Sequence, residues 1–205
     1  MSAGEFVGVV DYGVGTWTSV VNMIDSLGIN VESCQNPDEL GKFSHIILPG
    51  VGNFSVAASQ LDLMGWRHSL LEKVSAGLPT LGICLGMQLL GEASEESSGK
   101  GLGVMPFESQ KLSENGALRV PHMGWNSVEI QTEHEIFSGW TPESRFYFVH
   151  SFAVPLSGAS TIGVTKHNEI FSSVVARENV VGVQFHPEKS HRFGKKLFEN
   201  FVRMG

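Results

Sequence analysis

The sequence predicts an α/β fold in which helices flank both faces of a mostly parallel central sheet, with an antiparallel β extension. The first half of the chain alternates short apolar runs with helical patterns, as parallel strands joined by helices do. The second half has closely spaced apolar runs separated by Gly, Pro and Asn turns, which is typical of antiparallel or mixed strands. The 205 residues are 41% apolar, enough to bury a core without disulfides or metal. We therefore expect residues 1–205 to form a single domain.

In the first half, uninterrupted apolar runs indicate strands that are buried on both faces, and helical periodicity lies between them. Asn53 can cap the second helix, and Gly28 can end the first because glycine readily adopts the left-handed conformation found after helix ends. The expected strands are 6–10, 29–33, 45–48 and 80–83, and the expected helices are 19–27, 53–64 and 66–76.

In the second half, Gly, Pro and Asn turns lie between the apolar runs, a pattern that predicts antiparallel or mixed strands. The polar segment 92–100 is expected to be a surface loop, and a helical pattern covers 191–202 at the end of the chain. The expected strands are 104–107, 127–130, 145–149, 160–165, 170–176 and 181–185.

The most informative motif is Gly-Ile-Cys-Leu-Gly at 82–86, where an expected strand runs into a short helix that begins near Met87. This is the arrangement of a nucleophile elbow with Cys84 in place of serine. The nucleophile must stand on a strained turn, and glycine on both sides avoids clashes there. The N-terminus of the helix would favour a thiolate. A buried structural cysteine beside packing glycines is the alternative.

A candidate base lies in His-Pro-Glu at 186–188. On an extended chain the side chains of His186 and Glu188 point to the same side, and Pro187 disfavours a helix at this point. Glu188 could then accept a hydrogen bond from the imidazole of His186 and orient it toward a nucleophile. A histidine at the end of a strand that simply bonds its neighbour is the structural alternative.

A glycine-rich turn at 49–53 follows an expected strand and precedes a helix, so its backbone N–H groups could receive a developing oxyanion. A loop can also need glycine for its conformation alone. The phosphate-binding motifs do not match, because Gly13-Val14-Gly15 lacks a third glycine and Lys100 is followed by Gly101 rather than Ser or Thr. The sequence has no C-x-x-C or H-E-x-x-H motif, so we expect neither a metal site nor a cofactor.

Composition excludes several function classes. Lys and Arg number 14 against 21 Asp and Glu, and the net charge of −7 argues against sequence-independent nucleic-acid binding. Cys34 and Cys84 are too few for a disulfide scaffold and fit a reducing, cytoplasmic compartment. The N-terminal residues do not read as a signal peptide, and the uncharged run 74–91 contains too many glycines and polar residues for a membrane span. We expect a cytoplasmic protein that contacts neither nucleic acid nor membrane.

Taken together, the motifs resemble those of the class I (triad-type) glutamine amidotransferases, and among them the glutaminase subunits of imidazole glycerol phosphate synthases. The elbow and His-Pro-Glu are shared across the class, whereas Pro-His-Met-Gly-Trp-Asn at 121–126 is typical of these subunits. The resemblance spans essentially the whole chain. Further matching segments are Asp-Tyr-Gly-Val-Gly at 11–15, Leu-Pro-Gly-Val-Gly-Asn-Phe at 48–54, Tyr-Phe-Val-His-Ser at 147–151 and Val-Gln-Phe-His-Pro-Glu-Lys-Ser at 183–190.

The resemblance implies a class I amidotransferase fold, with Cys84 as nucleophile, His186 as general acid and base, and Glu188 as the residue that orients His186. Attack of the thiolate on the carboxamide of L-glutamine would release ammonia, and hydrolysis of the thioester would give glutamate. The oxyanion hole would be formed by backbone N–H groups of Gly50, Val51, Gly52 and Leu85. The amino-acid end of glutamine would be held by Gln88, by the backbone near Gly52, and by His150, Ser151 and Phe152.

The resemblance also implies a heterodimer with a cyclase subunit that has a (β/α)8 barrel fold, since free ammonia would protonate and diffuse away in water. In the family, ammonia reaches a ribonucleotide intermediate in the barrel. The products are imidazole glycerol phosphate and an aminoimidazole carboxamide ribonucleotide, in histidine biosynthesis. The family's glutaminase is nearly silent until the partner's ligand rearranges the turn at Gly50 and Val51. Glycine on both sides of Val51 would permit such a peptide rotation.

One segment departs from the family pattern, which usually continues Asn-Leu-x-Ser-Val after 11–15, where this chain reads Thr16-Trp17-Thr18-Ser19-Val20. The departure leaves open a paralogous glutaminase subunit that feeds an acetamidino-sugar synthase. A stand-alone thiol hydrolase on a similar sheet is another alternative, because fold and elbow alone do not determine function. A non-catalytic binding subunit would be expected to lack part of the triad, which this chain keeps.

Overall fold

The computed structural model describes residues 5–15, 17–156 and 160–204. Within them the central sheet has eight strands, in the order β2-β1-β3-β4-β13-β12-β11-β8. The parallel strands are β2 (Asn30–Cys34), β1 (Phe6–Val10), β3 (His45–Leu48), β4 (Thr80–Ile83) and β13 (Val180–Val183). The antiparallel strands are β12 (Glu169–Arg177), β11 (Thr161–His167) and β8 (Glu129–Ile130). The predicted mostly parallel sheet with an antiparallel extension is confirmed.

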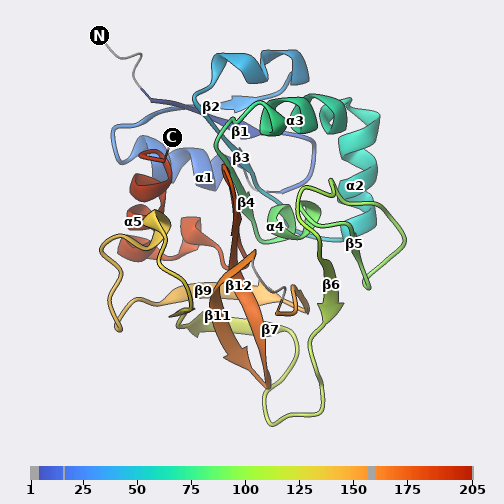
Figure 1. Ribbon diagram of the computed structural model, residues 1–205, viewed down its shortest axis with the longest axis vertical. Helices are drawn as coiled ribbons and strands as arrows, with labels where there is room; N and C mark the ends of the chain where they lie inside the picture. The colour runs from blue at the N-terminus through green and yellow to red at the C-terminus, as the bar shows by residue number, and fades with distance from the viewer. Residues whose placement is uncertain (1–4, 16, 157–159, 205) are drawn as a thin grey trace.

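Helices cover both faces of this sheet (Figure 1). α1 (Trp17–Asp25) and α5 (His191–Phe201) pack on one face. α2 (Phe54–Leu63), α3 (Trp66–Ser75) and α4 (Leu85–Leu89) pack on the other, and η1 (Pro37–Lys42) joins them. Along β1, Val9 belongs to one core and Val10 to the other. This two-sided burial explains why the parallel strands read as continuous apolar runs.

The expected cap at Asn53 is confirmed, whereas the first helix ends earlier than expected. The Asn53 side chain accepts hydrogen bonds from the N–H groups of Ser55 and Val56 at the start of α2. Gly28 has φ 74°, a conformation that glycine adopts without a Cβ clash, although α1 itself ends at Asp25, two residues before the expected end, and a turn leads to Gly28. Of the segment that departs from the family pattern, Thr16 lies outside the described residues, and α1 begins at Trp17.

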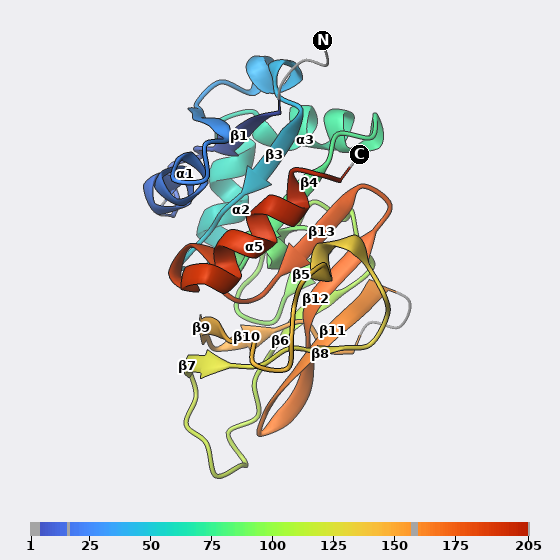
Figure 2. The ribbon, with the colours of Figure 1, turned by 90° about the vertical axis from the view of Figure 1, so that its left-hand side faces the viewer.

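Two small sheets lie beyond the carboxyl ends of the parallel strands (Figure 2). β7 (His122–Asn126) pairs antiparallel with β9 (Phe146–His150), and β9 reaches the main sheet through a bridge between Tyr147 and His186. The second sheet has the order β10-β6-β5, formed by β10 (Phe152–Ala153), β6 (Glu108–Lys111) and β5 (Ala93–Ser94). Among the described residues, the 3-10 turns η2 (Glu135–Phe137) and η4 (Pro187–Lys189) both contact α5.

The expected strand 104–107 is wrong. Its apolar residues Met105 and Phe107 are buried, but Pro106 has no N–H group for a strand ladder, and β6 begins only at Glu108. The apolar run therefore reflects side chains that are buried in the core without being paired in a strand.

The expected strand 127–130 is reduced to β8, and β7 was not expected. In β7 the outward-facing Met123 and Trp125 are exposed although apolar, whereas His122 is polar but buried. This reverses the usual polar and apolar alternation of a half-buried strand. The segment 92–100 is likewise more than a surface loop, because it contains β5.

The uncharged run 74–91 covers the end of α3, all of β4 and all of α4. Among residues 5–15, 17–156 and 160–204, no helix combines the length and apolar character that a membrane crossing requires.

Candidate active site

Three loops that follow neighbouring parallel strands meet at one edge of the sheet. β4 lies between β3 and β13, and all three run parallel, so their carboxyl ends share that edge. Cys84 follows β4, the turn 49–53 follows β3, and His186 stands three residues after β13. The order of strands thus brings together motifs that are far apart in the chain.

Cys84 stands on a strained turn, with φ 54° and ψ −108°, directly before α4. A Cβ at Gly82 would lie 2.8 Å from the carbonyl oxygen of Gly86, and a Cβ at Gly86 would collide with the carbonyl oxygen of Leu48. The two flanking glycines are therefore required by the close approach of backbone, and the predicted elbow geometry is confirmed.

His186 and Glu188 form a buried pair. The Nδ1 atom of His186 lies 2.7 Å from Oε1 of Glu188, and the two side chains are 1% and 2% exposed. The expected contact is present, but its backbone differs from the expectation. Only His186 is extended, and Glu188 lies in the 3-10 turn η4, which begins at Pro187. Proline is tolerated as the first residue of such a turn because its missing N–H would have no partner there.

The imidazole is held in a charged environment. Burial alone would lower the pKa of His186, but its interactions with the charged Cys84 sulfur and with Glu188 raise that pKa to about 10. A protonated imidazole beside a cysteine favours the thiolate. Because Nδ1 is bound to Glu188, Nε2 is the nitrogen left for the sulfur, and it has no hydrogen-bond partner among the described residues.

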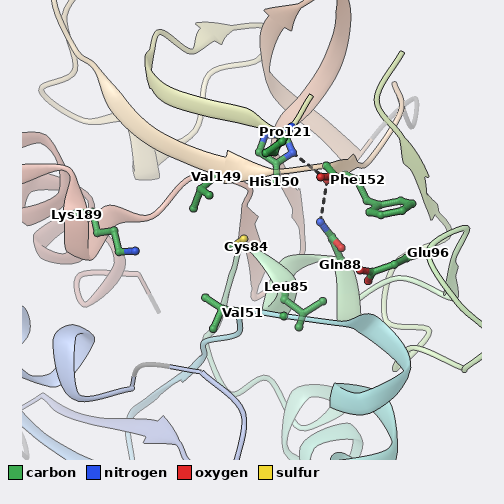
Figure 3. Close-up of a pocket in the computed structure, with 12 residues that line it drawn as sticks. Val51, Cys84, Leu85, Gln88, Glu96, Pro121, Val149, His150, Phe152 and Lys189 are labelled. Carbon is green, nitrogen blue, oxygen red and sulfur yellow. Dashed lines mark hydrogen bonds between the residues drawn. The ribbon is translucent and has the colours of Figure 1, made fainter. Parts of the chain in front are cut away.

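The sulfur of Cys84 borders a pocket of about 530 Å³ (Figure 3). Gly50, His186 and Glu188 are not among the residues that line it. Gly50 and His186 each interact with a lining residue, Gly50 through its carbonyl with Leu85 and His186 with Cys84. The predicted residues that line the pocket are Val51, Gly52, Cys84, Leu85, Gln88, His150, Ser151 and Phe152.

Four lining residues were not predicted: Glu96, Pro121, Val149 and Lys189. Glu96 comes from the segment expected as a surface loop, and its Oε2 accepts a hydrogen bond of 2.7 Å from the N–H group of Phe54. Nothing in the sequence distinguishes Glu96 from its neighbour Glu95, because their difference depends on how β5 turns back toward α2.

The turn 49–53 does not present a free oxyanion hole in this structure. The N–H group of Leu85 donates to the carbonyl of Gly50 at 3.3 Å, and the hydroxyl of Tyr12 donates to the carbonyl of Pro49 at 2.8 Å. A Cβ at Gly50 would lie 2.7 Å from that hydroxyl and 2.9 Å from Cβ of Leu85. The turn is therefore packed closely against the elbow, with a carbonyl where the predicted site needs a free N–H.

The amide of Gln88 is fixed by two acceptors. Its Nε2 donates to the carbonyl of Phe152 at 3.0 Å and to Oε1 of Gln184 at 3.2 Å, and the first of these bonds is drawn in Figure 3. Both amide hydrogens are thus used inside the protein, so the amide oxygen is the atom of Gln88 that remains for a ligand. Gln184 was not singled out from the sequence, although it stands in the matching segment 183–190.

Comparison with known proteins places these observations in a family. The model of the family "Glutamine amidotransferase class-I" matches residues 8–204. A protein of Pseudomonas aeruginosa named imidazole glycerol phosphate synthase subunit HisH 2 is 42% identical over 198 residues, which covers 96% of this chain and 98% of that protein. The subunit HisH of Methanocaldococcus jannaschii is 41% identical over 199 residues, covering 97% and 99%.

Solved structures with lower sequence identity share the fold. A putative GMP synthase subunit from Thermoplasma acidophilum matches with a TM-score of 0.73 and 20% identity, covering 99% of this chain and 94% of that one. A chain of the PurLQS structure from Thermotoga maritima matches with a TM-score of 0.74 and 17% identity, covering 98% of both chains.

Proposed function

The chain belongs to the class I glutamine amidotransferase family, and from this premise we propose that it is the glutaminase subunit of an imidazole glycerol phosphate synthase. It hydrolyses L-glutamine to glutamate and ammonia and supplies the ammonia for histidine biosynthesis, as a single-domain cytoplasmic protein. The observation that carries this proposal is the meeting of Cys84 with the buried His186–Glu188 pair at the wall of a pocket. The names of its full-length relatives indicate the pathway.

The geometry supports a thioester mechanism. The Cys84 thiolate attacks the carboxamide carbon of glutamine, and the negative charge moves to the carboxamide oxygen. Nε2 of His186 then gives its proton to the amide nitrogen, so that ammonia leaves and a glutamyl thioester remains. His186 next removes a proton from water, which attacks the thioester and releases glutamate. Glu188 holds the Nδ1–H group of His186 throughout and stabilises its cation.

The pocket also offers partners for the amino-acid end of glutamine. The α-ammonium group can donate to the free oxygen of Gln88 and pair with the carboxylate of Glu96, both of which line the pocket. Residues 150–152 line the same pocket. A negative side chain beside the ammonium would select an amino acid over an uncharged amide.

Replacement of Glu96 by glutamine is expected to raise KM for glutamine by about tenfold, the effect of losing a charged hydrogen-bond partner, with a smaller change in kcat. Steady-state kinetics of glutamate release measures both parameters. Glu95→Gln is the matched control, because the Glu95 carboxylate accepts from the N–H group of Lys111 and does not line the pocket. Equal KM values for the Glu96→Gln enzyme and the wild type would show that Glu96 does not bind glutamine.

We further propose that a cyclase partner with a (β/α)8 barrel forms a heterodimer with this chain and controls the turn 49–53. Rotation of the peptide between Gly50 and Val51 would withdraw the Gly50 carbonyl from the N–H group of Leu85 and turn the Val51 N–H group toward the pocket. Two N–H groups would then face the developing oxyanion. Beside the pocket, β7 presents Met123 and Trp125, which are 63% and 48% exposed, and exposed apolar side chains of this size are typical of interaction surfaces.

The experiment that tests this function measures glutamine hydrolysis by the glutaminase alone, with the cyclase, and with the cyclase and its ribonucleotide. We expect the rate to rise by about 100-fold in the last condition, near the upper range of typical coupling between two sites. Ammonia should appear in imidazole glycerol phosphate rather than in solution. Equal rates in all three conditions would instead indicate a stand-alone hydrolase, and failure to bind the cyclase would indicate a paralogue that serves another synthase.

A further inference from the structure

Gln184 lies beside the nucleophile because of the register between β4 and β13. Val183 stands opposite Ile83 in this parallel pair, and the N–H group of Cys84 donates to the Val183 carbonyl at 2.8 Å. The next residue, Gln184, is 0% exposed, and its Nε2 lies 3.7 Å from Sγ of Cys84. The sulfur therefore has a buried amide as a neighbour in addition to the imidazole of His186.

The hydrogen bonds around Gln184 determine which end of its amide faces the sulfur. The Phe152 carbonyl can only accept, and Gln88 Nε2 lies 3.0 Å from it, so Gln88 must place its nitrogen there. The same nitrogen lies 3.2 Å from Gln184 Oε1. The oxygen of Gln184 is thus turned toward Gln88, and its N–H group is left to point at Cys84.

Two buried histidines complete the network. His150 Nδ1 lies 2.9 Å from the Phe152 carbonyl and must donate to it, and His150 Nε2 lies 3.1 Å from His122 Nδ1. Burial lowers the pKa of His150 to about 3 and that of His122 to about 4, so both rings are neutral. His122 therefore donates from Nδ1, and its Nε2 accepts from the Asn126 amide at 3.2 Å. Every link from Asn126 to Cys84 has one donor and one acceptor.

We propose that Gln184 is a further residue of this glutaminase site: its amide N–H group donates to the Cys84 sulfur and favours the thiolate. The network through Gln88, the Phe152 carbonyl, His150 and His122 holds the amide in that orientation. A hydrogen bond to a charged acceptor is about twice as strong as one to a neutral group, so the contact gains strength when Cys84 ionises. The proposal rests on the proposed function of Cys84, and it gives His122, in the segment 121–126, a positioning role at the opposite end from the nucleophile.

The test uses Gln184→Met, which keeps an unbranched side chain of similar length but removes the donor. We expect alkylation of Cys84 by iodoacetamide at pH 7 to slow by about tenfold, and its pH profile to move up by about one unit, the effect of losing a hydrogen bond to a charged group. His186 and Tyr12, two titratable groups that interact with Cys84, are unchanged in this variant. In the complex with the cyclase and its ribonucleotide, this variant should also hydrolyse glutamine with a lower kcat than the wild type.

The control is Asn200→Leu, which removes another buried amide that donates to two carbonyls, those of Ile136 and Ser138. It should lower stability without moving the alkylation profile. A second variant, His122→Phe, keeps ring stacking on Phe148 but loses the donor to His150, and it should slow alkylation two- to threefold. If Gln184→Met does not fold, the alkylation rate of Cys84 in His122→Phe tests the proposal instead.

Wild-type rates and pH profiles in whichever of these variants folds would overturn the proposal. Failure of the proposed function would look different, because Cys84 of the wild-type protein would then itself react no faster than an ordinary thiol. The two outcomes are separated by comparing wild-type Cys84 with a small thiol such as glutathione in the same assay.

Discussion

Replacement of Cys84 by alanine is expected to reduce glutamine hydrolysis by at least about 10³-fold, as loss of a catalytic nucleophile generally does, while the protein stays folded. Alanine and cysteine both carry a Cβ and are equally strained at φ 54°, so the substitution should leave the elbow conformation unchanged. Glutamate release in the complex with cyclase and ribonucleotide measures activity. Circular dichroism and co-elution with the cyclase measure folding and assembly.

The matched control for this variant is Cys34→Ala. Cys34 is buried at the end of β2, its thiol donates to the Asn36 carbonyl at 3.3 Å, and burial raises its pKa to about 11. At neutral pH it is therefore almost entirely a thiol and a poor nucleophile, and the variant should keep its activity. Substantial hydrolysis by the Cys84→Ala protein, or its loss in Cys34→Ala alone, would show that the nucleophile has been misassigned.

Replacement of Glu188 by glutamine is expected to lower kcat by about 10⁴-fold, the effect known for the orienting carboxylate of a triad. The carboxylate of Glu188 accepts a hydrogen bond from the Nδ1–H group of His186 and helps to raise the pKa of His186. A neutral amide would allow the other imidazole tautomer and would destabilise the imidazolium cation that protonates the leaving amide nitrogen. Slow alkylation of Cys84 should persist, because the thiol remains at the pocket.

The destabilisation caused by Glu188→Gln should also depend on pH. The pKa of His186 is raised from 6.5 to about 10 in the folded protein, so the stabilisation is fully present below pH 6.5 and is lost as the pH rises through about 10. The difference in unfolding free energy between wild type and Glu188→Gln should shrink over that range in urea titrations. The control is Glu199→Gln, which removes a partly exposed partner of Lys196. Its free energy of unfolding should differ little from that of the wild type, both below pH 6.5 and near pH 10. A pH-independent difference for Glu188→Gln would mean that His186 is not charged in the folded state.

The parallel part of the fold was predictable because its strands are buried on both faces and bounded by clear helix signals at Gly28 and Asn53. The elbow was predictable for a similar reason, since Gly82 and Gly86 report backbone contacts that no other residue permits. In both cases the local sequence carries the physical constraint directly.

Other parts of the site depend on contacts between distant segments. The contact of Gln184 with Cys84 follows from the pairing of β13 with β4, which no local pattern specifies. Glu96 reaches the pocket from a polar segment, and β7 was missed because Met123 and Trp125 face outward. The apolar run 104–107 was misread for the converse reason, since its side chains are buried without strand pairing.

The central claim is that the sulfur of Cys84 attacks glutamine at this pocket. Its most direct test is to treat the complex with a glutamine-like diazoketone, digest the chain and locate the adduct by mass spectrometry. We predict one adduct, on Cys84, that forms more slowly when glutamine is present and is absent from Cys84→Ala. An adduct on Cys34 instead, or continued ammonia release from protein fully modified at Cys84, would contradict the account.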